Sequence, residues 1–308
     1  MNYAVLFPGQ GSQTIGMGAD VFAQRPDLLG AAAEQTLGWS LERLVASGSE
    51  EELTRTDRAQ PALYGVAYAL WEAFSAAVST PPIAAAGHSL GEYTALAAAG
   101  AMDFQTGLGL VAARGTAMQR CAEQADSGMA ALLGADLATA EALCDARRES
   151  GGELWVANIN APGQVVVAGG AEDIHWAVEH GRDHGVRRVI PLKVAGAFHS
   201  PFMAAASQEL GAALAGVTFA TPAFDVFANV TAAPVNDIRS NLADQLVNQV
   251  RFSETLLAMA DAGVGTFVHI GPGDVTATMA RRTVKQASVL VVSEIDDIAA
   301  VAEELTVQ

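Results

Sequence analysis

The chain has 308 residues, of which 51% are hydrophobic and 17% charged, and its formal net charge is −17. This composition excludes a disordered tail, and the negative charge disfavours broad binding to nucleic acid or to an anionic membrane. We expect one large domain or two unequal ones around a substantial core.

A membrane-spanning helix needs an apolar run of about 18 residues, and no run in this sequence is that long. The first residues, 1–7, lack the basic start of a signal peptide. Cys121 and Cys144 match no metal or redox spacing, so we expect two reduced structural thiols. The sequence therefore predicts a cytoplasmic protein that binds neither membranes nor nucleic acid and that carries no cofactor and no metal.

Tyr3–Phe7 is the first predicted element, a buried strand stopped by the glycine-containing stretch 8–13. The glycines there do not fit G-x-G-x-x-G, which argues against a dinucleotide site. What remains is a loop with accessible backbone amides. Helical patterns follow over about 27–46 and 59–78.

Gly87-His88-Ser89-Leu90-Gly91 fits G-x-S-x-G, the sharp turn from strand to helix that exposes a serine hydroxyl at the top of a sheet. The apolar run 82–86 before it predicts a strand, and the helix formers 92–99 after it predict a helix. Glycines flank the serine because side chains there would clash as the strand folds back. Ser89 is therefore a candidate nucleophile at a helix N-terminus; a tight turn with an incidental serine is the alternative.

Asp103 is a good N-cap for the next helix, which starts at 104 and carries Arg114. The patterns beyond it predict, in order, strand 128–135, helix 137–148, strands 154–160 and 164–168, helix 172–184 and strand 187–194. The order βαββαβ is typical of a ferredoxin-like unit. After it come a helix from 202, a strand over 266–270, a helix that Asp274 can cap, and a strand over 289–292.

The resulting prediction is an α/β fold. Residues 1–126 and 195–308 are expected to form a hydrolase-like core with a largely parallel sheet. Residues 127–194 are expected to form a small ferredoxin-like domain inserted into it.

A serine hydroxyl is a weak nucleophile and needs a base. Of the six histidines, His199 is the best candidate, because it lies in a glycine-containing loop after a predicted strand. A histidine that caps the following helix is the alternative. His88 should point away from Ser89, and His269 lies in a predicted buried strand. The remaining three fall on the predicted exposed helix, namely His175, His180 and His184.

Acyl transfer also needs donors for an oxyanion. A sharp turn from strand to helix that carries a nucleophile is called a nucleophile elbow. The residue after such a nucleophile usually supplies one backbone N–H, here that of Leu90, and the Gln10 segment is the candidate for a second.

Two groups of basic residues stand out against the acidic background, either as solvated faces or as a local site for an acidic partner. They are Arg187, Arg188 and Lys193, and Arg281, Arg282 and Lys285.

Several blocks of the chain together resemble the malonyl-CoA:acyl carrier protein transacylase family, in order and nearly end to end. They are Phe7–Gln13, Gly87–Tyr93, Arg114-Gly115 with Met118-Gln119, Asn160–Val166 and Gly271–Gly273. The resemblance implies a monomer whose partners are malonyl-CoA and an acidic acyl carrier protein. It implies that Ser89 is acylated, that His199 is its base, and that the Gln10 and Leu90 amides form the oxyanion hole.

The resemblance also implies that Arg114 holds the malonyl carboxylate. The histidine of this family is oriented by a backbone carbonyl, expected near 248–251, where many hydrolases use an aspartate. Phe198 is expected to narrow the acyl pocket, as in malonyl-type rather than methylmalonyl-type enzymes.

Ala197-Phe198-His199 also looks like the acyltransferase modules of polyketide synthases. The expected role is therefore malonyl transfer for fatty-acid biosynthesis, with a polyketide or malonate decarboxylase carrier as the alternative. A serine esterase or thioesterase is less favoured, because it has no use for a cation in its acyl pocket. A noncatalytic subunit that binds a carrier protein is disfavoured by the intact Ser89 and His199.

Overall fold

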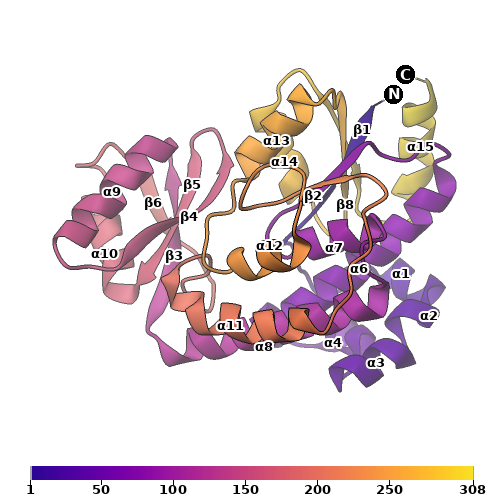
Figure 1. The fold of residues 1–308 in the computed structure, drawn as a ribbon, viewed down its shortest axis with the longest axis horizontal. Coiled ribbons are helices and arrows are strands. Elements are labelled where there is room, and N and C mark those ends of the chain that lie inside the picture. Colours follow the sequence, from indigo (N-terminus) through magenta and orange to yellow (C-terminus); the bar gives the residue numbers. More distant parts are fainter. Residues whose placement is uncertain (1, 308) are drawn as a thin grey trace.

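The structure, a computed structural model, describes residues 2–307 and contains two sheets (Figure 1). The larger sheet has five strands, and every neighbouring pair in it is parallel. Its strands, in spatial order, are β7 (Asp225–Phe227), β2 (Ala84–Gly87), β1 (Tyr3–Phe7), β8 (Thr266–Ile270) and β9 (Ser288–Val292). The predicted α/β fold with a parallel core sheet is confirmed.

Helices cover both faces of this sheet, as parallel sheets require. Alternate side chains of β1 point to opposite faces: Val5 and Phe7 join the core beneath the first group of helices, whereas Ala4 and Leu6 pack toward the second. The first group includes α6 (Thr56–Ala77), α7 (Gly91–Ala98) and α8 (Phe104–Gln124). The second consists of α13 (Phe252–Asp261) and α14 (Val275–Thr283).

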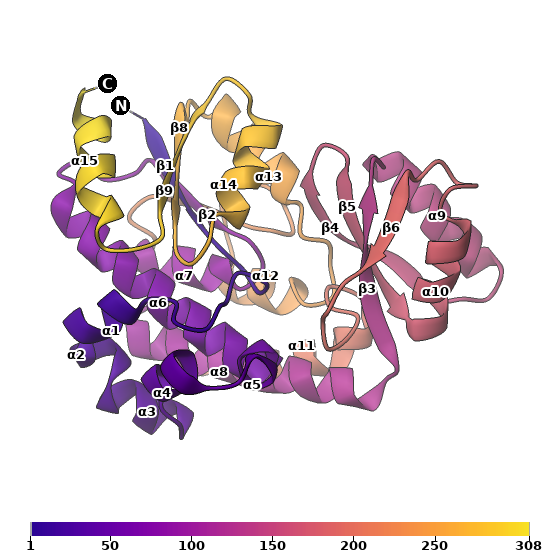
Figure 2. The ribbon, with the colours of Figure 1, turned by 180° about the vertical axis from the view of Figure 1, so that it is seen from behind.

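The smaller sheet is antiparallel and lies to one side of the larger one in both views (Figures 1 and 2). Its spatial order is β4-β5-β3-β6, the arrangement of a ferredoxin-like unit. In chain order its elements are β3 (Ser127–Leu133), α9 (Leu137–Glu149), β4 (Leu154–Ala161), β5 (Gln164–Gly170), α10 (Ala171–His180) and β6 (Arg188–Pro191). The expected βαββαβ order is confirmed, and the domain boundaries at 126 and 195 stay a prediction.

The prediction of one helix over 27–46 is wrong, because glycine divides this segment into shorter helices. Gly38 has φ 76°, a left-handed conformation that ends a helix, and Ser40 then caps a new one by accepting from Arg43 N–H at 3.3 Å. The segment forms α2 (Pro26–Leu29), α3 (Ala31–Leu37) and α4 (Leu41–Ser47), after α1 (Ala19–Gln24) and before α5 (Glu50–Thr54).

Other boundaries also differ from the expectations. The helix expected over 172–184 ends at His180, and the helix expected from 202 begins as a 3₁₀ turn, Pro201–Met203, followed by α11 (Ala204–Ala215). Asp274 precedes α14 but accepts from the Thr278 hydroxyl at 3.2 Å rather than from a backbone N–H of the first turn. The patterns missed the strand β7 and several helices outright. These helices are α1, α5, α12 (Ile238–Asp244), α13 and α15 (Asp297–Val307).

The segment between α12 and α13 is attached to the edge of the small sheet through the backbone of Val250. Its N–H donates to the carbonyl of Ala157 at 2.8 Å, and its carbonyl accepts from the N–H of Ile159 at 2.9 Å. Val250 therefore extends the edge of β4 as an isolated parallel bridge.

None of the helices in residues 2–307 combines the length and the apolar composition that crossing a membrane requires.

The glycines that flank Ser89 provide a test of this packing. A Cβ at Gly91 would overlap the carbonyl oxygen of Phe7 and lie 2.8 Å from that of Pro8, both rigid backbone atoms. We expect Gly91→Ala to lower the free energy of unfolding by about 2 kcal/mol or more, measured by urea denaturation.

Gly109 is the matched control, since it lies inside α8 and an added Cβ meets no atom within 4 Å. Gly109→Ala should raise the free energy of unfolding by about 0.5 to 1 kcal/mol. Equal effects of the two substitutions would contradict the close approach at Gly91.

Candidate active site

Ser89 lies on a strained turn between β2 and α7. Its φ is 50°, in the left-handed region that non-glycine residues rarely adopt. The strand doubles back so tightly that a Cβ at Gly87 would overlap the backbone of Gly91. The structure therefore contains the predicted sharp turn from strand to helix, with the serine at the start of the helix. This turn, residues 87–91, is the elbow.

Parallel pairing brings three loops together at the carboxyl ends of neighbouring strands. Phe7 of β1 pairs with Gly87 of β2, and Ala86 of β2 pairs with Phe227 of β7. The residues just beyond these strand ends include Gln10, Ser89 and Asn229, which are distant in sequence. Ligand sites of parallel sheets form at this edge.

His199 approaches Ser89 from the segment that follows the small sheet. Its Nε2 lies 2.8 Å from Ser89 Oγ, and its Nδ1 lies 2.8 Å from the carbonyl oxygen of Gln245. The carbonyl can only accept, so Nδ1 carries the proton and the lone pair of Nε2 faces the serine hydroxyl. His199 has φ 58°, so both partners of this contact are held in the left-handed region.

Burial, and then the positive charge of Arg114, lower the pKa of His199 to about 3, although the Gln245 carbonyl acts to raise it. The imidazole is therefore neutral and can accept a proton. The carbonyl that orients it belongs to Gln245, three residues before the expected segment 248–251, although the backbone of Asn248 also acts on the imidazole to raise its pKa.

Arg114 is fully buried beneath Ser89. Its Nη2 donates to Ser89 Oγ at 2.9 Å and to Gln245 Oε1 at 3.0 Å, and its Nη1 donates to Gln60 Oε1 at 2.7 Å. The guanidinium also lies 5.5 Å from the centre of the Tyr93 ring. Burial lowers its pKa from the ordinary arginine value, which reports the cost of holding the charge there.

Arg114 has no carboxylate partner in an ion pair within residues 2–307, and its Nε has no hydrogen-bond partner there. Buried charges are normally paired. Glu92 acts on this charge only at longer range, since the Gln245 amide lies between the two groups. The site therefore presents a cation without a direct anionic partner next to a serine hydroxyl, which suits a ligand that carries an anion close to its reacting carbon.

A cavity of about 260 Å³ opens onto Ser89 and His199. Gln10, Phe198 and Met118 line it as well, which places the expected pocket residue Phe198 at the site. No residue among 2–307 accepts a hydrogen bond from the backbone N–H of Gln10 or Leu90. Both groups remain free to donate to a ligand, as an oxyanion hole needs.

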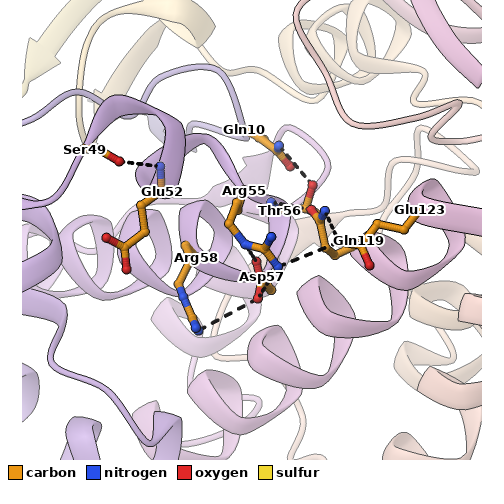
Figure 3. A network of polar contacts seen from close by, with 9 residues as sticks. All are labelled: Gln10, Ser49, Glu52, Arg55, Thr56, Asp57, Arg58, Gln119 and Glu123. Carbon is orange, nitrogen blue, oxygen red and sulfur yellow. Dashed lines mark hydrogen bonds and ion pairs between the residues drawn. The ribbon is translucent and has the colours of Figure 1, made fainter.

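The glycine loop that carries Gln10 is held at both sides. A Cβ at Gly9 would overlap the carbonyl oxygen of His88, so the loop lies directly on the elbow. Gln10 Nε2 donates to Thr56 Oγ1 at 3.4 Å, and the Thr56 N–H donates to Gln119 Oε1 at 3.0 Å (Figure 3). These contacts tie the loop to α6 and α8 and give Gln119 a structural role.

The sequence patterns missed three polar residues at the base of the elbow, all without exposed surface: Glu92, Asn229 and Gln245. Asn229 Oδ1 accepts from Ser89 N–H at 2.7 Å, and its Nδ2 donates to the Gly87 carbonyl at 2.7 Å. Gln245 Nε2 donates to the Ser89 carbonyl at 3.0 Å. Only Glu92 gave a signal, as a lone charge in an apolar helical stretch.

The other histidines lie apart from Ser89 Oγ. His88 Nε2 bonds Asn160 Oδ1 at 2.7 Å, and buried His269 bonds the Gly271 carbonyl at 3.1 Å. His175 is exposed, and the His180 ring hydrogen-bonds the Trp176 carbonyl at 3.0 Å, while His184 lies beyond the end of α10.

Among the described residues no group of three or more His, Cys, Asp or Glu side chains is arranged to hold a metal ion.

Comparisons with known proteins find relatives along nearly the whole chain. A family model described as acyl transferase domain matches residues 5–303. The malonyl CoA-acyl carrier protein transacylase of Bacillus subtilis (strain 168) is 38% identical over 296 residues, covering 94% of this chain and 93% of that protein. The polyketide biosynthesis malonyl CoA-acyl carrier protein transacylase BaeC of Bacillus velezensis is 40% identical over 283 residues, covering 90% and 95%.

Solved structures are equally similar. The complex PlMCAT:AntF, described as a type II PKS acyl-carrier protein with its malonyl-transacylase, matches with a TM-score of 0.93 and 35% identity. The match covers 99% of this chain and 100% of that one.

Asn229 offers a test of how the elbow is held. Asn229→Ala leaves Ser89 N–H and the Gly87 carbonyl without their buried partner, so we expect the free energy of unfolding to fall by at least about 2 kcal/mol. Urea denaturation measures it. Asn248→Ala is the control, because that exposed side chain donates to the Asp244 carbonyl at 2.8 Å and holds no part of the elbow. Losses of the same size in both variants would argue against the role of Asn229.

Proposed function

The chain belongs to the malonyl-CoA–acyl carrier protein transacylases of the acyl transferase family, and from this we propose that it passes malonyl from coenzyme A to a carrier-protein thiol through an ester on Ser89. It is accordingly an acyltransferase. The observation that carries the proposed site is the unpaired guanidinium of Arg114, 2.9 Å from Ser89 Oγ.

In the first half-reaction His199 Nε2 takes the proton of Ser89 as Oγ attacks the thioester carbonyl of malonyl-CoA. The N–H groups of Gln10 and Leu90 stabilise the oxyanion, each by about 3 kcal/mol. The C–S bond then breaks, and His199 returns the proton to the departing thiolate. Ser89 is left as the malonyl ester.

The second half-reaction reverses these roles. The phosphopantetheine thiol of the carrier gives its proton to His199 and attacks the ester carbonyl. The same N–H groups stabilise the second oxyanion, and the proton on His199 passes to Ser89 Oγ as the ester breaks. Because Nδ1 stays hydrogen-bonded to the Gln245 carbonyl throughout, the imidazole keeps its orientation between the two steps.

Arg114 supplies the specificity in this proposal. The malonyl carboxylate lies within a few bonds of the ester carbon, so it can replace Ser89 Oγ as an acceptor for Nη2, and the planar guanidinium can bind both of its oxygens. An acetyl group would leave the buried cation unpaired. Phe198, on the cavity wall, is proposed to disfavour the extra methyl of methylmalonyl by about 1 to 3 kcal/mol.

We propose fatty-acid biosynthesis as the pathway served, because relatives with the general transacylase name align along nearly their whole length, such as those of Bacillus subtilis and Escherichia coli. A polyketide carrier is the alternative, supported by the likeness to BaeC and to PlMCAT.

We also propose a cytoplasmic location, because the two buried cysteines are free thiols, as expected in a reducing compartment. A monomeric state stays a prediction, as does the lack of nucleic-acid and membrane binding.

The carrier is proposed to dock on the basic residues around the cavity. Lys193 lines the cavity that holds Ser89, and so do Val275 and Met279 of α14, whose last turn carries Arg281 and Arg282. Both basic groups are exposed, and none of their members forms an ion pair within residues 2–307. They therefore offer a positive rim on an acidic protein, which suits an acidic partner.

Substitution of Arg114 tests the proposed function. We expect Arg114→Ala to lower kcat/KM for malonyl transfer at least about 100-fold, because the carboxylate loses its buried partner. Acetyl transfer should be unchanged or faster. The measurement is the competition of malonyl-CoA and acetyl-CoA for one carrier protein, together with the mass of the intact enzyme after each thioester.

Arg120→Ala is the matched control, since Arg120 lies on the same helix but pairs with Glu209 at 2.8 Å on the surface. A parallel loss of malonyl and acetyl transfer in Arg114→Ala would remove the carboxylate role. A parent enzyme that releases free malonate without a carrier, rather than holding a stable adduct, would instead favour the esterase alternative.

Charge reversal tests the docking surface. The double variant Arg187→Glu with Arg188→Glu should raise KM for the carrier protein and leave the slow hydrolysis of malonyl-CoA unchanged, since the carrier loses its electrostatic attraction. Arg43→Glu, at an exposed arginine on α4, is the control for charge reversal elsewhere on the surface, and each single variant, Arg187→Glu or Arg188→Glu, matches its change in net charge. Equal carrier KM values in the double variant and the parent would exclude these two residues from docking.

A further inference from the structure

Glu92 is a fully buried carboxylate that the reaction described above does not use. It lies in the first turn of α7, one residue beyond the glycine that ends the elbow. Its oxygens accept from three N–H donors: the backbone of Asn229 at 3.0 Å, Nε2 of Gln245 at 2.7 Å, and Nδ2 of Asn241. A carboxylate thus joins the serine helix to segments about 140 residues later in the chain.

The contact with Gln245 has consequences for the active site. The Gln245 amide is planar, so fixing its Nε2 on Glu92 directs its Oε1 toward Arg114, 3.0 Å away. The backbone of the same residue supplies the carbonyl that orients His199. Gln245 lies at the end of α12, and the neighbouring Val250 is fixed on β4. The carboxylate therefore anchors one end of the segment that holds the proposed base.

The three donors suit the ionised carboxylate. A protonated Glu92 would be a weaker acceptor for all three, and it would add an O–H donor to a site already occupied by N–H donors. The charged and titratable groups that face it from the helices around it are Arg114 on α8, whose charge favours ionisation, and Tyr93 on α7. Asn229, Asn241 and Gln245 are neutral, and His199 lies beyond Gln245.

Building on the proposed function, we infer that ionised Glu92 is a positioning residue for acylation of Ser89, because it holds Gln245 in the conformation that serves His199 and Arg114. Loss of its charge releases Gln245. Burial raises the pKa of Glu92 to about 7, against the three hydrogen bonds and Arg114, which act to lower it. The charge is therefore lost as pH falls through neutrality.

The experiment measures single-turnover acylation of Ser89 by malonyl-CoA between pH 5 and pH 9. The parent rate should fall on the acid side with a midpoint near 7. Burial and the charge of Arg114 lower the pKa of His199, so the titration of His199 itself is expected at lower pH. Glu92→Gln should lower the rate at high pH by about 10- to 100-fold, because Gln245 is misplaced, and should abolish the acid limb.

A second variant keeps the test independent of the folding of Glu92→Gln. Asn241→Ala removes one donor from Glu92 but touches neither Ser89 nor His199, so the midpoint should move upward by about one pH unit. Ser240→Ala, an exposed neighbour on α12, should leave the midpoint in place.

The inference is overturned if folded Glu92→Gln keeps the parent pH profile, or if Asn241→Ala does not move the midpoint. A carboxylate that only stabilised the fold would lower the melting temperature without changing either profile. A parent enzyme that forms no malonyl ester on Ser89 would refute the proposed function instead.

Discussion

Burying the guanidinium of Arg114 without a carboxylate partner is the constraint on which the site depends. The side chain has no exposed surface, and every acceptor it has in the described chain is neutral. Such a charge is costly in a protein interior, and the fold offsets part of the cost with oriented amides from Gln60 and Gln245. Glu92 offsets part of the charge from beyond Gln245, and the proposed malonyl carboxylate would be the first anion in direct contact with the guanidinium.

The same amide of Gln245 that solvates Arg114 also reaches Glu92 and the carbonyl of Ser89. His199, Ser89 and Arg114 are therefore all in contact with one residue, Gln245, which in turn donates to a buried carboxylate. Strain is part of this arrangement, since Ser89 and His199 both adopt φ values in the left-handed region and face each other at 2.8 Å. Such strained backbone conformations persist only where the surrounding hydrogen bonds stabilise them by more than the strain costs.

The position of the small sheet explains how a carrier-borne thiol reaches this buried centre. The cavity above Ser89 is lined by both parts of the chain, with Val166 and Asn158 from the small sheet and Met279 from α14. Arg282 crosses between them and donates to Gln164 Oε1 at 2.6 Å. The proposed positive rim therefore lies where α14 meets the small sheet, beside the cavity that contains Ser89.

Elements with local signals could be predicted from the amino-acid sequence. The glycines around Ser89, the apolar run of β1 and the βαββαβ order are each readable within a few residues, because tight turns and strand burial impose residue types directly. His199 was identifiable by its place after a strand, and Arg114 through resemblance. Two features became visible only in the folded chain: Arg114 has no ion-pair partner among the described residues, and Asn229, Gln245 and Glu92 form hydrogen bonds at the base of the elbow. These contacts join residues more than 100 positions apart, and no local pattern encodes which polar side chains long-range packing will bring together.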